Sequence, residues 1–453
     1  VTPTRAGGFD QKIAIIGAGP AGLSCAFYLA EKGYKPVVFE KNERPGGMLT
    51  YGIPSFKLEK DVIEAEVEII RLMGAEFRYG VEVGRDVTLD ELREQGFKAF
   101  YVAIGCQGGR LAGIPGEDAE DVTVAVDFLR EVNSGKIDTL SGRTIVVGGG
   151  NVAIDVARNA CRLGSEHVEM FCLESEVQMP ASEEERREAV EDGAHISCGW
   201  GPKEIHLDEA GRVCGITFKR CTRVFDDEGR FAPEYDENDL RRVDADRVVM
   251  SIGQSIVWGD LLAGSKVELG RGQGALADPQ TYQTAEPDIF VGGDVYTGPS
   301  FAIDAIAAGH EAAVSIHRFV QPGSTLTIGR NQRRYTALDR DDVVLESYDN
   351  ASREVAHVDR EREKAAPFSE YVETFTEEQV RAETTRCLGC GASIVDPNKC
   401  IGCGLCTTKC AFDAIHLDRD RPECSTMVKY EQKLPSLGKY ALKRAIKIKF
   451  GRK

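Results

Sequence analysis

Six cysteines in one stretch of the chain have the residue type and the spacing of iron–sulfur ligands. They are Cys387, Cys390, Cys400, Cys403, Cys406 and Cys410. The last four follow the order C-x-x-C-x-x-C-x-x-x-C, in which three thiolates wrap one face of a cubane and the fourth usually binds a second cluster. The spacing therefore predicts a ferredoxin-like segment with 4Fe-4S chemistry, which moves single electrons.

The number of clusters is left open by the cysteine count. Seven of the 14 cysteines lie from Cys387 to Cys424, whereas two all-cysteine clusters need four ligands each. An oxygen ligand such as Asp396, a cysteine from another protein, or a single cluster would each resolve the shortfall, and we favour two clusters over one. Zinc is disfavoured, because two C-x-x-C pairs would suffice for it.

A glycine-rich turn near the start of the chain indicates chemistry of a second kind. Strand, turn, helix and strand follow one another over residues 12–17, 17–22, 21–33 and 35–40. Gly17 permits a tight turn, Gly19 lets the backbone approach a pyrophosphate, and Gly22 lets the helix pack closely. The second strand ends in Glu40, which can bind a ribose hydroxyl. This order predicts a dinucleotide site.

A second unit of the same plan spans residues 142–174. Its fingerprint is Gly148-x-Gly150-x-x-Ala153, and its second strand ends in Glu174, 21 residues past Ala153. A carboxylate at that position binds a ribose 2′-OH and repels a 2′-phosphate, so NAD(H) is favoured over NADP(H). The alternative is a degenerate unit that binds no nucleotide.

Three later segments indicate which nucleotide is the flavin. The stretch 288–316 is predicted to form a strand, a loop with Asp294 and a helix that begins near Pro299. It resembles the flavin-binding segment of FAD enzymes with two dinucleotide domains, and residues 99–106 and 246–255 resemble the crossings between those domains. The resemblance implies that the first unit binds FAD and the second binds NAD.

Four further motifs narrow the resemblance. Residues 43–58, 113–118, 148–158 and 177–182 resemble the small, NADPH-oxidising subunit of glutamate synthase and related ferredoxin–NAD(P) oxidoreductase flavoproteins. In that family an arginine pair reads the NADPH phosphate where this chain has Leu173-Glu174, which supports NADH. The short stretch before the first strand contains no cysteine, so we expect the family's cysteine-rich N-terminal domain to be lacking, and a cysteine-rich segment follows near the other end instead.

Motifs and resemblance together give the candidate cofactor residues. For FAD they are Gly17, Gly19, Pro20, Ala21, Gly22, Glu40, Lys41, Gly46, Gly47, Met48, Tyr51, Gly52, Ile53, Pro54, Ala103, Ile104, Gly105, Gly293, Asp294, Ser300, Phe301 and Ala302. For NAD they are Gly148, Gly149, Gly150, Asn151, Val152, Ala153, Glu174, Ile252 and Gly253.

We expect an α/β protein with two Rossmann-like domains and a small ferredoxin-like domain. The boundaries are expected at 1–115 with 282–330 for the FAD domain, 116–281 for the NAD domain, 331–385 for a linker, 386–424 for the iron–sulfur domain and 425–453 for a basic tail.

The net charge of −17 argues against general nucleic-acid binding, and no apolar run is long enough to span a membrane, so a cytoplasmic location is expected. Residues 429–453 carry nine Lys or Arg and one Glu, which predicts a solvated helix or a surface that docks an acidic subunit.

The combination predicts an NADH-linked oxidoreductase subunit. Electrons would move between NAD(H), FAD and the clusters, and partner iron–sulfur or catalytic subunits, a ferredoxin among them, would exchange electrons with the chain. No catalytic side chain is expected, because hydride transfer needs positioning above all. A dithiol mechanism is disfavoured, since the cysteines from Cys25 to Cys221 include no C-x-x-C. A self-sufficient reductase of a small substrate, glutamate-synthase-like or dihydropyrimidine-dehydrogenase-like, and a non-catalytic assembly subunit remain alternatives.

Overall fold

The computed structural model of the chain describes residues 3, 6–328, 330, 352–387, 400–408, 415–417 and 429–450. They fall into two compact units, Val1–Leu345 with Val355–Thr376, and Glu346–Glu354 with Glu377–Lys453. Both glycine-rich turns belong to the first unit, and the cysteine run belongs to the second. Cys390 and Cys410 lie outside the described residues.

A five-stranded parallel sheet organises the first dinucleotide domain. Its order is β15-β4-β1-β2-β3, formed by Ile289–Val291, Phe97–Val102, Lys12–Ile16, Val37–Glu40 and Glu76–Tyr79. The apolar runs predicted around residues 12 and 37 form strands because both faces of the sheet are covered. Ile13 and Ile15 face one core, and Ala14 and Ile16 face the other.

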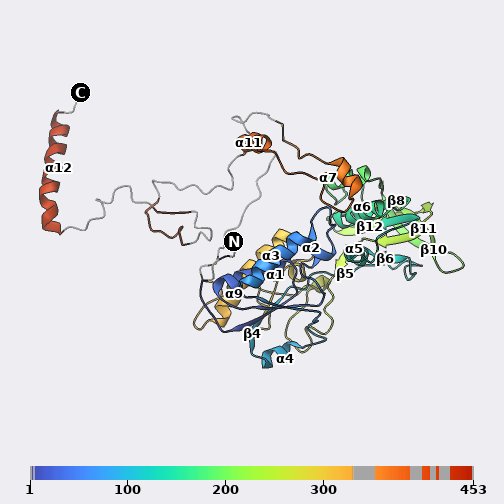
Figure 1. The fold of residues 1–453 in the computed structure, drawn as a ribbon, viewed down its shortest axis with the longest axis horizontal. Coiled ribbons are helices and arrows are strands. Elements are labelled where there is room, and N and C mark those ends of the chain that lie inside the picture. The colour runs from blue at the N-terminus through green and yellow to red at the C-terminus, as the bar shows by residue number, and fades with distance from the viewer. Residues whose placement is uncertain are drawn as a thin grey trace. The chain divides into compact units, whose positions relative to one another are not determined.

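Helices α1 (Pro20–Lys32) and α9 (Ala302–Val320) lie side by side on one face of this sheet (Figure 1). Small residues let them meet, since a Cβ added to Gly309 would overlap the Ala21 carbonyl oxygen. Helix α3 (Lys60–Leu72) covers the same core through Val67 and Ile70. The short helices α2 (Met48–Tyr51) and α4 (Leu89–Glu94) complete this part of the domain.

A second five-stranded parallel sheet organises the other domain. Its order is β6-β13-β7-β8-β9, formed by Val122–Val124, Arg247–Met250, Arg143–Val147, His167–Cys172 and His195–Cys198. Helices α5 (Ala125–Asn133), α6 (Asn151–Arg162) and α7 (Glu183–Glu191) share its core. An antiparallel sheet of β10 (Trp200–Leu207), β11 (Val213–Phe225) and β12 (Phe231–Val243) packs on the opposite face through Phe218 and Trp200.

The chain crosses between the domains at two paired segments. Strands β5 (Gly108–Gly109) and β14 (Gln254–Ser255) form a short antiparallel ribbon at these crossings. Beyond the ribbon, Trp258, Leu261 and Ala275 pack into the core that β1 and β4 share. This stretch of the chain also contains the 3₁₀ turn Arg271–Gln273. The chain therefore re-enters the first domain earlier than the expected boundary at residue 282, because these apolar side chains cover the open face of its sheet.

The loop predicted around Asp294 contains a short helix, and the predicted helix follows it as a separate element. A short helix, α8, spans Asp294–Thr297, and α9 begins at Ala302 instead of near Pro299. Gly298 separates them with a φ of 76°, which a residue with a side chain rarely adopts.

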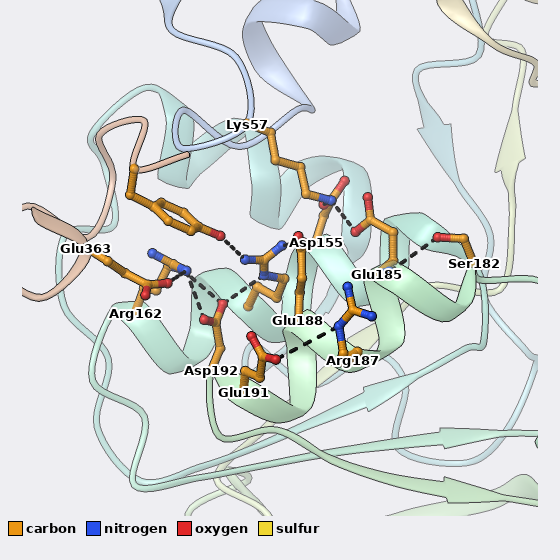
Figure 2. A network of polar contacts seen from close by, with 12 residues as sticks. Lys57, Asp155, Arg162, Ser182, Glu185, Arg187, Glu188, Glu191, Asp192 and Glu363 are labelled. Atoms are coloured by element: carbon orange, nitrogen blue, oxygen red, sulfur yellow. Dashed lines mark hydrogen bonds and ion pairs between the residues drawn. The ribbon is translucent and has the colours of Figure 1, made fainter. Parts of the chain in front are cut away.

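Residues Val355–Thr376, here called the strap, form part of the first unit although they fall in the predicted linker. The strap contains helix α10 (Arg360–Ala365), and its ends pair through Asp359 N–H to Tyr371 O at 2.9 Å. Tyr371 is buried, and its hydroxyl accepts a hydrogen bond from Arg158 at 2.6 Å. The strap therefore closes over α6 (Figure 2).

The second unit contains two described helices, α11 (Glu377–Arg386) and α12 (Tyr430–Phe450). Helix α11 begins with Glu377 and Glu378 in its first turn, and α12 forms in the basic tail, where a helix was one of the two expectations. None of the helices in the described ranges combines the length and apolar content that a membrane crossing requires.

Tyr371→Phe should lower the free energy of unfolding by roughly 1–2 kcal/mol, because the buried guanidinium of Arg158 loses one hydrogen-bond partner. The midpoint of urea unfolding measures this. Tyr101→Phe is the matched control, since its buried hydroxyl has no partner among the described residues and its removal should leave stability unchanged or raised. Equal losses in both variants would contradict the role given to the strap.

Candidate functional site

A cavity of roughly 740 Å³ lies where the two dinucleotide domains meet. The turn after β1, the loops after β4 and β15, and the N-terminus of α6 all line it. These are carboxyl ends of parallel strands, where nucleotides bind in open α/β sheets. Its size is in the range of small-molecule and cofactor sites.

Most of the predicted FAD residues line this cavity. They are Gly17, Gly19, Pro20, Ala21, Glu40, Gly47, Met48, Gly52, Ile53, Ala103, Ile104, Gly105, Gly293, Asp294, Ser300, Phe301 and Ala302. Lys41 lines a smaller hollow beside it. The residues that line it do not include Gly22, Gly46, Tyr51 and Pro54.

Backbone contacts between three loops shape the floor of the cavity. A Cβ on Gly17 would lie 2.5 Å from the Ala103 carbonyl oxygen, and one on Gly47 would lie 2.9 Å from the Gly19 Cα. A Cβ on Gly22 would overlap the Gly17 carbonyl oxygen. The loops thus meet without side chains between them, and the N–H groups of the α1 N-terminus are left facing the cavity, which suits a pyrophosphate.

Glu40 is buried at the edge of the same floor. One carboxylate oxygen accepts a hydrogen bond from Ala18 N–H at 2.8 Å, and the other accepts from the backbone and the side chain of Asn42. The oxygen that accepts from Ala18 keeps a second lone pair for a ribose hydroxyl, whereas the other oxygen already accepts two hydrogen bonds. The residues present therefore fit an FAD, whose adenosine Glu40 would hold.

Asp294 approaches the cavity from the opposite wall. Burial raises the pKa of its carboxyl, and hydrogen bonds from the backbone N–H groups of Ser300 and Cys106 act in the other direction. Behind it, the N-terminus of α9 begins at Ala302, so the dipole of that helix also points toward the cavity. Phe301 at its start is largely exposed and would border the flavin.

The second glycine turn contributes the facing wall. Gly150, Asn151 and Val152 line the cavity, whereas Gly148, Gly149 and Ala153 lie beneath them. A Cβ on Gly149 would lie 3.1 Å from a carboxylate oxygen of Glu174, so this side chain rests beside the turn. Ile252 and Gly253 do not line the cavity, but the next residue, Gln254, does.

The arginines near Glu174 are engaged with acids or with the backbone. Arg220 stacks on Trp200 at 3.9 Å and pairs with Asp239 at 3.2 Å. Arg223 pairs with Glu234, and Arg186 donates to a backbone carbonyl at 2.7 Å. Each of these guanidinium groups would have to leave a partner to hold a 2′-phosphate.

An ion-pair cluster joins the two domains beside the cavity (Figure 2). Lys57, which follows the FAD-binding stretch, donates to Asp155 at 2.6 Å and to Glu185, and these two acids belong to α6 and α7. Burial raises the pKa of Asp155 to about 6, and the ammonium of Lys57 opposes that rise. Asp155 also lines the cavity.

Sequence reasoning missed several residues of the cavity wall. They are Leu49, Gln107, Val126, Leu129, Asp155, Pro180, Gln254, Gly292, Pro299 and Ala305. Asp155 and Pro180 lie inside motifs that were recognised, at residues 148–158 and 177–182, so their position beside known fingerprints was a usable signal. Val126 and Leu129 carry no such signal, because they are ordinary apolar residues on α5.

The described cysteines of the cluster segment are exposed. They are Cys387, Cys400, Cys403 and Cys406, and Gly402 and Gly404 between them adopt positive φ angles. Within the described residues, no three metal-ligating side chains converge on one point. The ligand assignment therefore continues to depend on the spacing of the cysteines.

The two joined dinucleotide domains and their shared cavity define a flavoprotein of the two-dinucleotide-domain class. A family model described as "Pyridine nucleotide-disulphide oxidoreductase" matches residues 11–309, and one described as "4Fe-4S binding domain" matches residues 393–416. The chain belongs to the pyridine nucleotide-disulphide oxidoreductase family. It is an oxidoreductase that uses FAD and a pyridine nucleotide and carries a 4Fe-4S segment, as the sequence predicted.

Curated relatives confirm the resemblance to glutamate synthase. The chain is 36% identical over 330 residues to the NADPH glutamate synthase small chain of Escherichia coli (strain K12), with 69% of each chain covered. It is 36% identical over 399 residues to the NADP(+)-dependent formate dehydrogenase subunit beta of Moorella thermoacetica, with 84% of this chain and 54% of that one covered. The chain thus spans about half the length of the latter relative.

One further relative is named as NAD-dependent. The chain is 33% identical over 311 residues to the NAD-dependent dihydropyrimidine dehydrogenase subunit PreT of Escherichia coli (strain K12), with 68% of each chain covered.

Solved structures confirm the fold. FprA from Mycobacterium tuberculosis matches with a TM-score of 0.60 at 20% identity, covering 69% of this chain and 85% of that one. Thioredoxin reductase of T. acidophilum matches with a TM-score of 0.53 at 19% identity, covering 68% and 98%.

The raised pKa of Asp155 predicts a pH-dependent stability. Between pH about 4 and 6 the unfolded chain ionises this carboxyl while the folded protein keeps its proton, so rising pH disfavours the folded state. The stability of Asp155→Asn relative to that of wild type should therefore rise by roughly 1–3 kcal/mol between pH 4.5 and pH 7. Thermal unfolding across this range measures the difference.

The control is Asp127→Asn, which alters an exposed aspartate on α5. Its stability relative to wild type should stay constant over the same pH range. If the stability of wild type instead rose relative to that of Asp155→Asn as the pH increased, the raised pKa of Asp155 would be contradicted.

Proposed function

We propose that this chain is the NADH-linked electron-transfer subunit of a larger redox complex. The observation that supports it above all is that one cavity is lined by both glycine turns, while a ferredoxin-type cysteine run belongs to the same polypeptide. When bound, FAD supplies the conversion between two-electron hydride chemistry and the one-electron chemistry of a 4Fe-4S cluster.

The residues of the cavity position their ligands without acting as acids or bases. The α1 N-terminus and Gly19 would hold the pyrophosphate of FAD, and the α9 N-terminus would stabilise negative charge on the flavin side. Val126, Leu129 and Val152 give the facing wall an apolar surface that excludes water from the place where the nicotinamide would lie.

The preference for NADH is supported by Glu174. Its carboxylate lies beside Gly149, where a 2′-phosphate would meet a negative charge, and the neighbouring arginines are engaged elsewhere. The names of the relatives include both NADPH and NAD, so the choice depends on this local chemistry and not on family membership.

Two clusters are the favoured content of the cysteine segment, with electrons leaving or entering there through partner redox subunits. Cys400, Cys403 and Cys406 would share a cluster with a remote cysteine, and Cys410 would bind the other. The curated names of the relatives describe subunits and a small chain, which supports a function within a complex.

Anaerobic mixing with NADH should bleach the flavin absorbance, and the band of the clusters should follow. NADPH should reduce the flavin at least about tenfold less efficiently, because a second negative charge at Glu174 costs more than 1 kcal/mol. Stopped-flow absorbance measures both. A flavin reduced by NADPH and not by NADH would overturn the nucleotide assignment.

Glu174→Ala should raise the KM for NADH by about tenfold, the loss expected when a hydrogen bond to a charged group is removed, and should improve the use of NADPH. Glu176→Ala removes an exposed carboxylate two residues further on and serves as the control. If both variants change the ratio of kcat/KM for NADH to kcat/KM for NADPH alike, general electrostatics and not the ribose contact decides the preference.

Iron and acid-labile sulfide should each reach about eight per FAD if two clusters are present and about four if one is present. Cys410→Ser should then reduce both contents and change the EPR spectrum of the reduced protein. Cys221→Ser, outside the segment, is the control and should leave the iron content unchanged. An iron content that is the same in Cys410→Ser and wild type would exclude Cys410 as a ligand.

A further inference from the structure

Two cysteines of the second domain lie side by side at the ends of neighbouring strands. Cys172 ends β8 and Cys198 ends β9, and the two residues are direct partners in the parallel register. Their Sγ atoms are 3.7 Å apart, although 26 positions separate them in the chain. Paired strands place Cα atoms within the range that a disulfide requires.

This pair of thiols contacts the turn that we assign to NADH. A Cβ on Gly149 would lie 2.9 Å from the Cys172 Cβ, so the turn packs directly on this cysteine. The Cys172 thiol donates to the Glu174 carbonyl oxygen at 3.6 Å, and the same oxygen accepts from Gly199 N–H at 2.9 Å. The position of Glu174 therefore depends on both strand ends.

The two thiols differ in access. Cys198 is half-buried and lines two surface hollows. Cys172 is buried, and burial raises the pKa of its thiol well above the ordinary value. Cys198 is thus the sulfur that an oxidant reaches first, and Cys172 is the neighbour that can complete a disulfide.

We propose that Cys172 and Cys198 form a redox-sensitive thiol pair, which a peroxide oxidises to a disulfide and which then weakens NADH binding. The effect on binding rests on the nucleotide site proposed above. Cys198 Sγ attacks one oxygen of hydrogen peroxide and the O–O bond breaks. The products are a sulfenic acid on Cys198 and one molecule of water. Cys172 Sγ then attacks the sulfur of that sulfenic acid, the S–S bond forms, and the hydroxyl of the sulfenic acid leaves as a second water. In total the two thiols lose two electrons and two protons, and hydrogen peroxide becomes two waters.

The bond would disturb the nucleotide turn for a geometric reason. A disulfide needs a sulfur separation of about 2.05 Å, so the two side chains, whose Sγ atoms are now 3.7 Å apart, must turn toward each other and away from their present contacts. The oxidised Cys172 can no longer donate to the Glu174 carbonyl oxygen. Both changes act on Glu174, the residue that would bind the ribose.

The test treats the full chain with hydrogen peroxide, alkylates the remaining thiols and digests with trypsin. Cleavage after Arg162, Arg186, Arg187 and Lys203 puts the two cysteines on separate peptides, 163–186 and 188–203, neither of which holds another cysteine. The expected product is one linked species, lighter than the sum of the two peptides by two hydrogens. The Kd for NAD+, measured by calorimetry, should rise about tenfold and recover with dithiothreitol.

Cys198→Ser should abolish the linked peptide and the change in Kd, whereas Cys214→Ser, a half-buried cysteine on β11, should keep both. The two variants carry the same cluster segment, so damage to clusters affects them equally. Two alkylated peptides after oxidation of wild type, or a linked pair with unchanged Kd, would overturn the proposal. Reduced protein that binds no NAD+ would refute the nucleotide site instead, and the peptide map would still decide whether the thiols pair.

Discussion

The close approach of backbone to backbone at the first glycine turn is the constraint on which the site depends. Gly22 packs against the Gly17 carbonyl, Gly17 against that of Ala103, and Gly47 against Gly19. A single added methyl group at Gly17 or Gly22 would push helix α1 away from the sheet. Because no side chain intervenes, the N-terminus of α1 opens directly onto the cavity, and its partial positive charge is available to a cofactor phosphate.

A polar network sets the relation between the two dinucleotide domains. Lys57 from the first domain contacts Asp155 on α6 and Glu185 on α7 of the second. The guanidinium groups of Arg158 and Arg162, also on α6, lie 4.8 and 4.2 Å from the centre of the Phe56 ring. Such buried charges contribute little net stability, since desolvation offsets their attraction. Their consequence is geometric: few arrangements of the domains satisfy all of these partners at once. In the strap, Tyr371 and Glu363 accept hydrogen bonds from Arg158 and Arg162 of α6, which restricts the arrangement further.

The chemistry of the chain is divided between its two units. The cavity offers two nucleotide turns and an apolar wall, which suit a hydride, and the cysteine segment offers thiolates, which suit single electrons. Sulfur also occurs beside the nucleotide turn, where Cys172 and Cys198 are placed by strand register and not by a C-x-x-C motif. The family is named for disulphide chemistry, yet in this chain the paired thiols lie at the Glu174 end of the second domain.

The sequence alone determined the two strand–turn–helix units, the return of the chain to the first sheet at Asp294 and the ferredoxin spacing of the cysteines. These are local patterns, in which neighbouring residues obey one backbone requirement. Only the tertiary structure decided that Asp155 meets Lys57, that the strap covers α6, that residues near Leu261 join the first domain, and that Cys172 meets Cys198. Each of these contacts joins residues far apart in the chain, and nothing in the local pattern of either partner specifies the other; packing of the sheets and register of the strands bring them together.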